Sequence, residues 1–112
     1  MKKYSLLLFT FILFYGCKKD KTSSVPICIK EKTEIFKSQI VCSSGAAVSK
    51  YSFQGKFVYL FGVGNCIADA GTNVFDENCN LLGTLGTLAG TNKVNGVNFE
   101  QNSTFIENLW SN

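Results

Sequence analysis

Apolar residues are arranged in three patterns along the chain, and each pattern predicts a different kind of segment. Residues 6–14 form an apolar run of nine positions, broken only by Thr10. Residues 26–40 place apolar side chains at helical spacing, because Ile29, Phe36 and Ile40 stand at i, i+7 and i+11. Residues 51–61 combine aromatic and β-branched residues around a central Gly55, which is typical of a strand pair. This combination predicts an α+β domain.

The predicted helix over residues 26–40 has recognisable ends. Pro26 suits a first helical position, because an N–H has no helical partner there, and Ser23 and Ser24 are candidate caps. Ile35 stands beside the apolar stripe and is expected to pack with it. Residues 43–47, Ser-Ser-Gly-Ala-Ala, are expected to break the helix and to lead into the first strand.

The strand pair is predicted to be a two-residue hairpin that turns at Gln54-Gly55. In that register Phe53 lies opposite Lys56, and Tyr51 lies opposite Val58. Because successive side chains point to opposite faces, both faces of the hairpin carry large apolar groups. One face holds Tyr51, Phe53, Val58 and Leu60, and the other holds Phe57, Tyr59 and Phe61 with Lys50 and Ser52. Both faces should therefore be covered, one of them by the helix.

Turn residues and short apolar runs organise the rest of the chain. Residues 73–75 are predicted to form a third strand that ends in a turn at Asp76. Residues 82–90 repeat Leu-Gly-Thr and are expected to be a strand and loop packed closely against other backbone. Asn95-Gly96 is a candidate tight turn, and residues 99–110 can form a terminal helix or strand. The predicted fold is an N-terminal amphipathic helix packed on a small antiparallel sheet of the hairpin and the third strand, followed by a short C-terminal helix or strand.

The apolar run near the N-terminus is a targeting signal, because it is about half the roughly 20 residues that a membrane-spanning helix needs. Lys2 and Lys3 precede it, as in a secretory leader. The run ends in Phe14-Tyr15-Gly16-Cys17, which resembles the lipobox of bacterial lipoproteins, where the cysteine is diacylated before cleavage. The alternative is an ordinary secretory leader whose Cys17 pairs with another cysteine. The predicted organisation is a lipoprotein signal peptide over residues 1–16, the acylated cysteine and a polar tether over residues 17–24, and a single domain over residues 25–112.

An acylated Cys17 makes the membrane an expected partner and predicts the location of the domain. We expect a protein of the bacterial cell envelope, lipid-anchored and on the outer membrane facing the periplasm. The tether contains Lys18, Lys19 and Lys21, which would lie against anionic headgroups.

Four cysteines remain once Cys17 is assigned to the anchor, and in an oxidising compartment an even number predicts two disulfides. Four cysteines allow three pairings. A hairpin would bring Cys42 and Cys66 to the same end, which leaves Cys28 at the helix to pair with Cys79 after the third strand. Zinc is not expected, because the cysteines are 14, 24 and 13 residues apart without a C-x-x-C, and the chain has no His. A catalytic cysteine would also lack its usual His partner.

Charge excludes one class of partner. From residue 22 onward six lysines stand against seven acidic residues, so the domain is near neutral although the whole chain carries a net charge of +3. The chain has no arginine and no basic stripe interleaved with aromatic residues. We therefore expect no nucleic-acid partner, because nothing would neutralise the phosphates.

The carboxylates of Asp69, Asp76 and Glu77 are the only acidic groups clustered in predicted loops. Asp69 and Asp76 stand beside small or polar turn residues, which favours turn and cap hydrogen bonds over catalysis. A calcium loop is the alternative, because residues 76–80 place oxygens at alternate positions. An EF-hand would however need glycine where Leu81 stands and a bidentate glutamate in place of Thr87. No cofactor or metal is expected.

Several segments together resemble a family of small lipoproteins of the Bacteroidota known only as a domain of unknown function. They are residues 42–48 (Cys-Ser-Ser-Gly-Ala-Ala-Val), 51–56 (Tyr-Ser-Phe-Gln-Gly-Lys), 58–61 (Val-Tyr-Leu-Phe), 64–69 (Gly-Asn-Cys-Ile-Ala-Asp), 74–79 (Val-Phe-Asp-Glu-Asn-Cys) and 82–86 (Leu-Gly-Thr-Leu-Gly), with Cys28 before them. In that family a second glycine often stands where this chain has Thr87, and some members carry extra cysteines. The resemblance implies a location and an architecture, but no reaction.

Three classes of function are consistent with these features. The favoured one is a non-enzymatic, membrane-anchored envelope module that binds a partner protein or a cell-wall component. An inhibitor of an extracellular or periplasmic hydrolase is the second, with residues 83–96 as the inhibitory loop. The third is a carboxylate-based enzyme or a calcium-binding module. A protruding loop would favour the inhibitor, whereas a concave pocket holding Asp69 and Asp76 would favour a ligand site or an enzyme.

Overall fold

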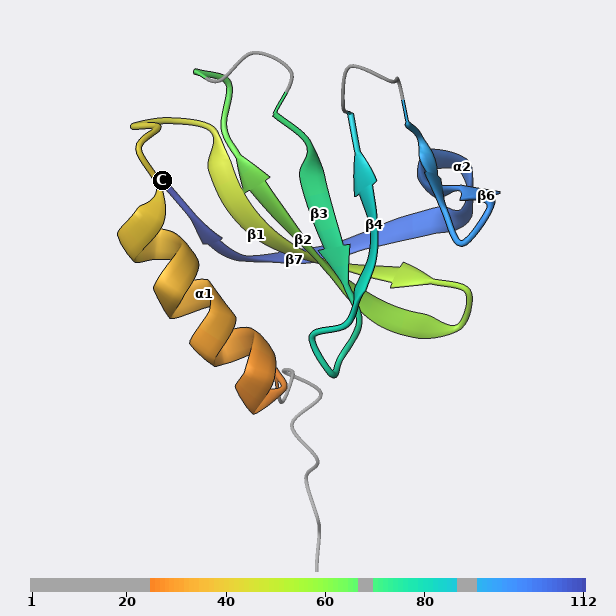
Figure 1. The fold of residues 1–112 in the computed structure, drawn as a ribbon. Helices are drawn as coiled ribbons and strands as arrows, with labels where there is room; N and C mark the ends of the chain where they lie inside the picture. The colour runs from red at the N-terminus through yellow and green to blue at the C-terminus, as the bar shows by residue number, and fades with distance from the viewer. Residues whose placement is uncertain (1–24, 67–69, 87–90) are drawn as a thin grey trace, which may run out of the picture.

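The computed structural model describes residues 25–66, 70–86 and 91–112 (Figure 1). A helix leads into a hairpin, and further strands and a one-turn helix follow. The elements in chain order are α1 (Ile27–Gln39), β1 (Ala46–Phe53), β2 (Lys56–Val63), β3 (Thr72–Phe75), β4 (Leu81–Leu85), β5 (Lys93–Val94), β6 (Val97–Asn98), α2 (Phe99–Asn102) and β7 (Ser103–Ser111). The predicted α+β class is confirmed.

The main sheet is antiparallel and five-stranded, in the order β4-β3-β2-β1-β7. The predicted sheet, a hairpin plus one further strand, therefore had too few strands. Residues 81–85 form a fourth strand beside β3, and the last strand crosses back to pair with β1. Residues 99–110 form both of the alternatives, a single helical turn in α2 and then the nine-residue β7.

The hairpin has the predicted register, with Phe53 opposite Lys56 and Tyr51 opposite Val58. Gln54 and Gly55 both have positive φ, at 51° and 74°, which is the backbone of a type I′ turn. The strands are longer than predicted at their open end. Ala46 and Ala47 continue β1 rather than break the helix, because they pair with Val63 and Gly62 of β2.

Both faces of the sheet are covered, as the two-sided apolar pattern required. On one face α1 contributes Ile29 and Phe36 to a cluster with Val48, Tyr59 and Phe61. On the opposite face Phe53, Val58 and Val74 pack with residues of the β5–β6 pair and α2, namely Val94, Val97 and Phe99. Figure 1 shows α1 on one side of the sheet and α2 with the β5–β6 pair on the other.

Two details of the predicted helix are wrong. Ile35 is 58% exposed, because the buried stripe of α1 passes through Thr33, whose hydroxyl donates to the carbonyl of Ile29 at 2.7 Å. A capping side chain is also absent at the start of the described helix. Pro26 itself is the N-cap and makes no side-chain cap bond, while Ser23 and Ser24 lie outside the described residues.

Two disulfides are present, Cys28–Cys79 and Cys42–Cys66, with Cα–Cα distances of 6.1 and 5.7 Å. This is the pairing that the hairpin argument favoured. The first joins the start of α1 to the turn between β3 and β4. The second joins the segment after α1 to the segment after β2, at the open end of the hairpin.

Candidate functional site

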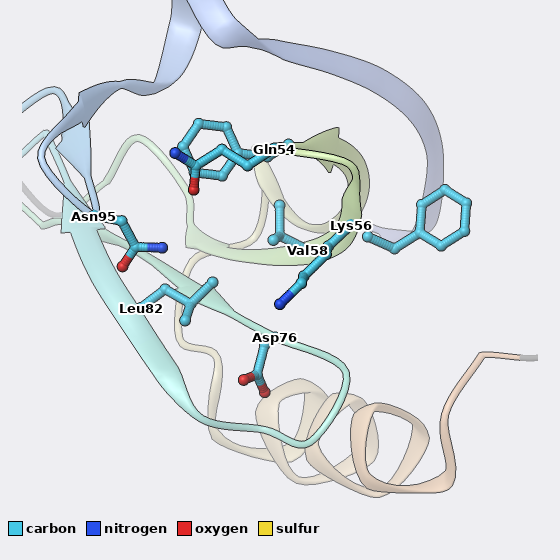
Figure 2. A pocket seen from close by; sticks show the side chains of 8 residues that line it. Gln54, Lys56, Val58, Asp76, Leu82 and Asn95 are labelled. Atoms are coloured by element: carbon cyan, nitrogen blue, oxygen red, sulfur yellow. The ribbon is translucent and has the colours of Figure 1, made fainter.

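Three turns that are far apart in the sequence border one pocket of about 200 Å³ (Figure 2). They are the β1–β2 turn, the β3–β4 turn and the β5–β6 turn. Lys56 reaches toward Asp76 on one side, and Gln54 and Asn95 lie on the other. The lining residues are Phe53, Gln54, Lys56, Phe57, Val58, Asp76, Leu82 and Asn95. The pocket thus combines an apolar floor with two charged and two amide side chains.

Each of these turns contains one non-glycine residue with a left-handed backbone. The φ angles are 51° at Gln54, 62° at Cys79 and 52° at Asn95. Asparagine before glycine is the usual choice for a type I′ turn, whereas glutamine is a less favourable residue there. The Gln54 side chain lines the pocket, and strained positions of this kind concentrate at functional sites.

Asp76 organises the β3–β4 turn through its carboxylate. Oδ1 accepts the backbone N–H groups of Asn78 and Asn80 at 2.8 and 2.9 Å, and Oδ2 accepts the Asn80 side-chain amide at 3.1 Å. The backbone carbonyl of Asp76 also accepts a hydrogen bond from the N–H of Cys79. Cys79 in turn forms the disulfide with Cys28. The turn-forming role expected for Asp76 is therefore seen in these bonds.

The electrostatics of Asp76 favour binding over proton transfer. Burial alone would raise the pKa of this carboxyl, but the hydrogen bonds from Asn80 and Asn78 and the positive charge of Lys56 outweigh it, so the pKa is lowered. The carboxylate is therefore anionic at neutral pH and a poor general acid. In the described part of the chain Lys56 forms no ion pair. Its ammonium group is available to a bound partner.

Replacing Asp76 with Ala is expected to cost about 1 kcal/mol of unfolding free energy at pH 7, because three backbone and side-chain donors lose their acceptor. Since the folded pKa is lowered, this stability is complete above the ordinary aspartate pKa of about 3.9 and is lost as the pH falls through the folded pKa. Denaturant titrations between pH 7 and pH 2 should show that the difference in unfolding free energy between the parent protein and Asp76→Ala disappears as the pH falls.

The matched control is Asp76→Asn, which keeps an acceptor oxygen but removes the titrating charge and its pH dependence. Millimolar calcium should leave every melting temperature unchanged. A rise of several degrees in the parent protein, absent in Asp76→Asn, would instead make this turn a calcium site.

A second charged side chain, Lys50, is buried on the α1 face with only 6% exposure. Its ammonium lies 4.0 Å from the centre of the Phe57 ring, and Tyr59 and Glu107 stand opposite it on the two neighbouring strands. Burial raises the pKa of Tyr59, and the charges of Glu77 and Glu107 raise it further. These contacts explain why a lysine is buried here: its aliphatic stem packs in the fold and its ammonium lies over an aromatic ring.

The structure brings only part of the sequence-predicted site together. Asp76 lines the pocket and Glu77 is exposed beside it, whereas Cys17 and Asp69 lie outside the described residues. Within those residues no three His, Cys, Asp or Glu side chains are grouped to hold a metal ion. Gln54, Lys56 and Asn95 were missed as site residues. Their positions in or beside predicted turns were visible in the sequence, but no sequence pattern indicated that the three turns lie next to one another.

The comparisons with known proteins identify the family and nothing more specific. A family described as a domain of unknown function, DUF6970, matches residues 34–112, and the chain belongs to this family. The matched region contains the three turns of the pocket and Cys42, Cys66 and Cys79, but it begins after Cys28. No curated protein and no solved structure matches the chain. None of the described helices is long and apolar enough to cross a membrane.

Proposed function

We propose that this protein is a lipid-anchored module of the bacterial cell envelope that binds a partner and does not catalyse a reaction. The anchor is Cys17, at the end of the leader over residues 1–16. The two disulfides support an oxidising compartment such as the periplasm, because structural disulfides persist there and are rare in the cytosol. The near-neutral domain supports a protein or cell-wall partner rather than a nucleic acid.

The observation that carries the binding role is the pocket at which the three turns converge. Its polar groups come from Gln54, Lys56, Asp76 and Asn95, on turns held in place by the sheet and by Cys28–Cys79. Such a site is preorganised, which lowers the entropic cost of binding. Asp76 is poorly suited to act as a general acid, because the hydrogen bonds from Asn80 and Asn78 lower the pKa of its carboxyl. The described residues also offer no histidine, since the chain contains none.

Site-specific photo-crosslinking in native membranes tests the proposed site. A photo-reactive residue in place of Lys56 should yield a discrete adduct with the partner. The matched control places it at Lys37, a lysine of α1 that pairs with Glu34 at 2.9 Å and lies outside this pocket. The same adducts from both positions, or an adduct from position 37 alone, would contradict binding at the three-turn pocket.

A further inference from the structure

We propose that the domain rests directly on the lipid surface through the end at which α1 begins, with Ile27 and Leu81 in contact with the bilayer. This inference rests on the proposed acylation of Cys17. It goes beyond that proposal because a lipid anchor by itself allows any orientation of the domain. The partner of this surface is the headgroup and upper acyl region of the membrane to which the chain is tethered.

The first observation is that two large apolar side chains are exposed at this end of the molecule. Ile27 is 74% exposed and Leu81 is 58% exposed. Ile27 precedes Cys28 and Leu81 follows Cys79 by two residues, and the Cys28–Cys79 disulfide holds the two segments with 6.1 Å between the cysteine Cα atoms. The disulfide therefore gathers both apolar groups at one end of the fold. Figure 1 shows α1 beginning beside the β3–β4 turn.

The second observation is the short length of chain between the anchor and this end. Eight residue steps separate Cys17 from Val25, the first described residue. Even a fully extended chain covers only about 28 Å over that number of steps. The start of α1 is thus the part of the domain held nearest to the lipid.

The chemistry of the contact is apolar rather than ionic. The β3–β4 turn carries Asp76 and Glu77 beside Leu81, so this end of the domain has no excess of positive charge of its own. Ile27 and Leu81 supply the hydrophobic contact, as side chains do where a domain lies on a bilayer surface. The contact should therefore persist on zwitterionic lipid.

Tryptophan quenching by brominated lipid tests this orientation. Trp110 is the only tryptophan, so Trp110→Phe gives a silent background. Ile27→Trp, Leu81→Trp and Val41→Trp are introduced one at a time into the full, lipidated chain and reconstituted in vesicles of brominated phosphatidylcholine. Val41 is the matched control, because it is 83% exposed and follows α1, whose 13 residues span about 20 Å.

We expect strong quenching at positions 27 and 81 and little at position 41. Equal quenching at all three positions, or none at 27 and 81 in protein that floats with the vesicles, would overturn the orientation while leaving the anchor intact. Protein that carries Cys17 but does not float with the vesicles would overturn the anchoring and this inference together. The three exposed positions tolerate an aromatic ring, and circular dichroism should show unchanged folding in each variant.

Discussion

Loss of the Cys28–Cys79 disulfide is expected to lower the free energy of unfolding by about 4 kcal/mol. The crosslink spans 51 residues. On the chain-entropy model, closing a loop of that length lowers the conformational entropy of the unfolded state, which corresponds to about 4 kcal/mol of stability. A domain of this size has a total stability of roughly 5–13 kcal/mol, so the loss is large. Guanidinium unfolding of Cys28→Ala/Cys79→Ala against the parent measures it.

The left-handed backbone of Cys79 supplies the control for this experiment. Its φ is 62°, a conformation that costs alanine roughly 1 kcal/mol but costs glycine little. Cys28→Ala/Cys79→Gly should therefore recover about 1 kcal/mol of the loss and no more. Cysteine carries the same Cβ in the parent, so the alanine pair isolates the loss of the crosslink. If the glycine variant regained most of the parent stability, relief of backbone strain at position 79 would be as large as the contribution of loop closure. A loss below about 1 kcal/mol in both variants would contradict a stabilising role for this disulfide.

Gly64→Ala is expected to destabilise the protein by about 3 kcal/mol, because a backbone cost and a steric cost add. Gly64 has a φ of 95°, which only glycine adopts readily. A Cβ there would stand 2.7 Å from Sγ of Cys42 and 2.7 Å from the carbonyl oxygen of Ser44. The substitution therefore presses on the Cys42–Cys66 disulfide. Urea unfolding of the oxidised protein gives the change in free energy.

Gly86→Ala separates the two costs. Gly86 also has a left-handed backbone, with a φ of 73°, but an added Cβ would meet no atom of the described residues within 4 Å. We expect a loss of only about 1 kcal/mol at this position. Equal losses at positions 64 and 86 would mean that the crowding beside Cys42 is relieved without cost.

Local patterns in the sequence were sufficient to predict α1, the hairpin and its register. Alternation of side chains fixes which residues share a face of a strand, and Gln54-Gly55 allows only one short turn between the two runs. The expected disulfide pairing followed from that hairpin, because antiparallel strands bring the segments beyond their ends together. The covering of both faces followed from the large apolar groups at Tyr51, Phe53, Tyr59 and Phe61.

Contacts between distant segments were not predictable in the same way. β7 pairs with β1 across 50 residues or more, and its register shifts twice, between Val48 and Ser49 and between Lys50 and Tyr51. Such shifts break the two-residue period on which a sequence argument depends. The pocket has the same origin, because its three turns become neighbours only when the main sheet is formed and the separate β5–β6 pair packs on it. Asp76 and Asn95 were both predicted as turn residues, but the sequence did not place them with Lys56 around one pocket.

The mass of the mature protein purified from membranes tests the central proposal most directly. The full chain is produced in a bacterium that processes lipoproteins, extracted in detergent and analysed intact and after proteolysis. We expect a polypeptide that begins at Cys17 and carries a diacylglyceryl group on its thiol and an acyl chain on its amino group. These chains would hold the protein on the membrane, whereas a single acyl chain binds only marginally. A mature protein that begins elsewhere, or one with an unmodified Cys17, would contradict the lipid anchor.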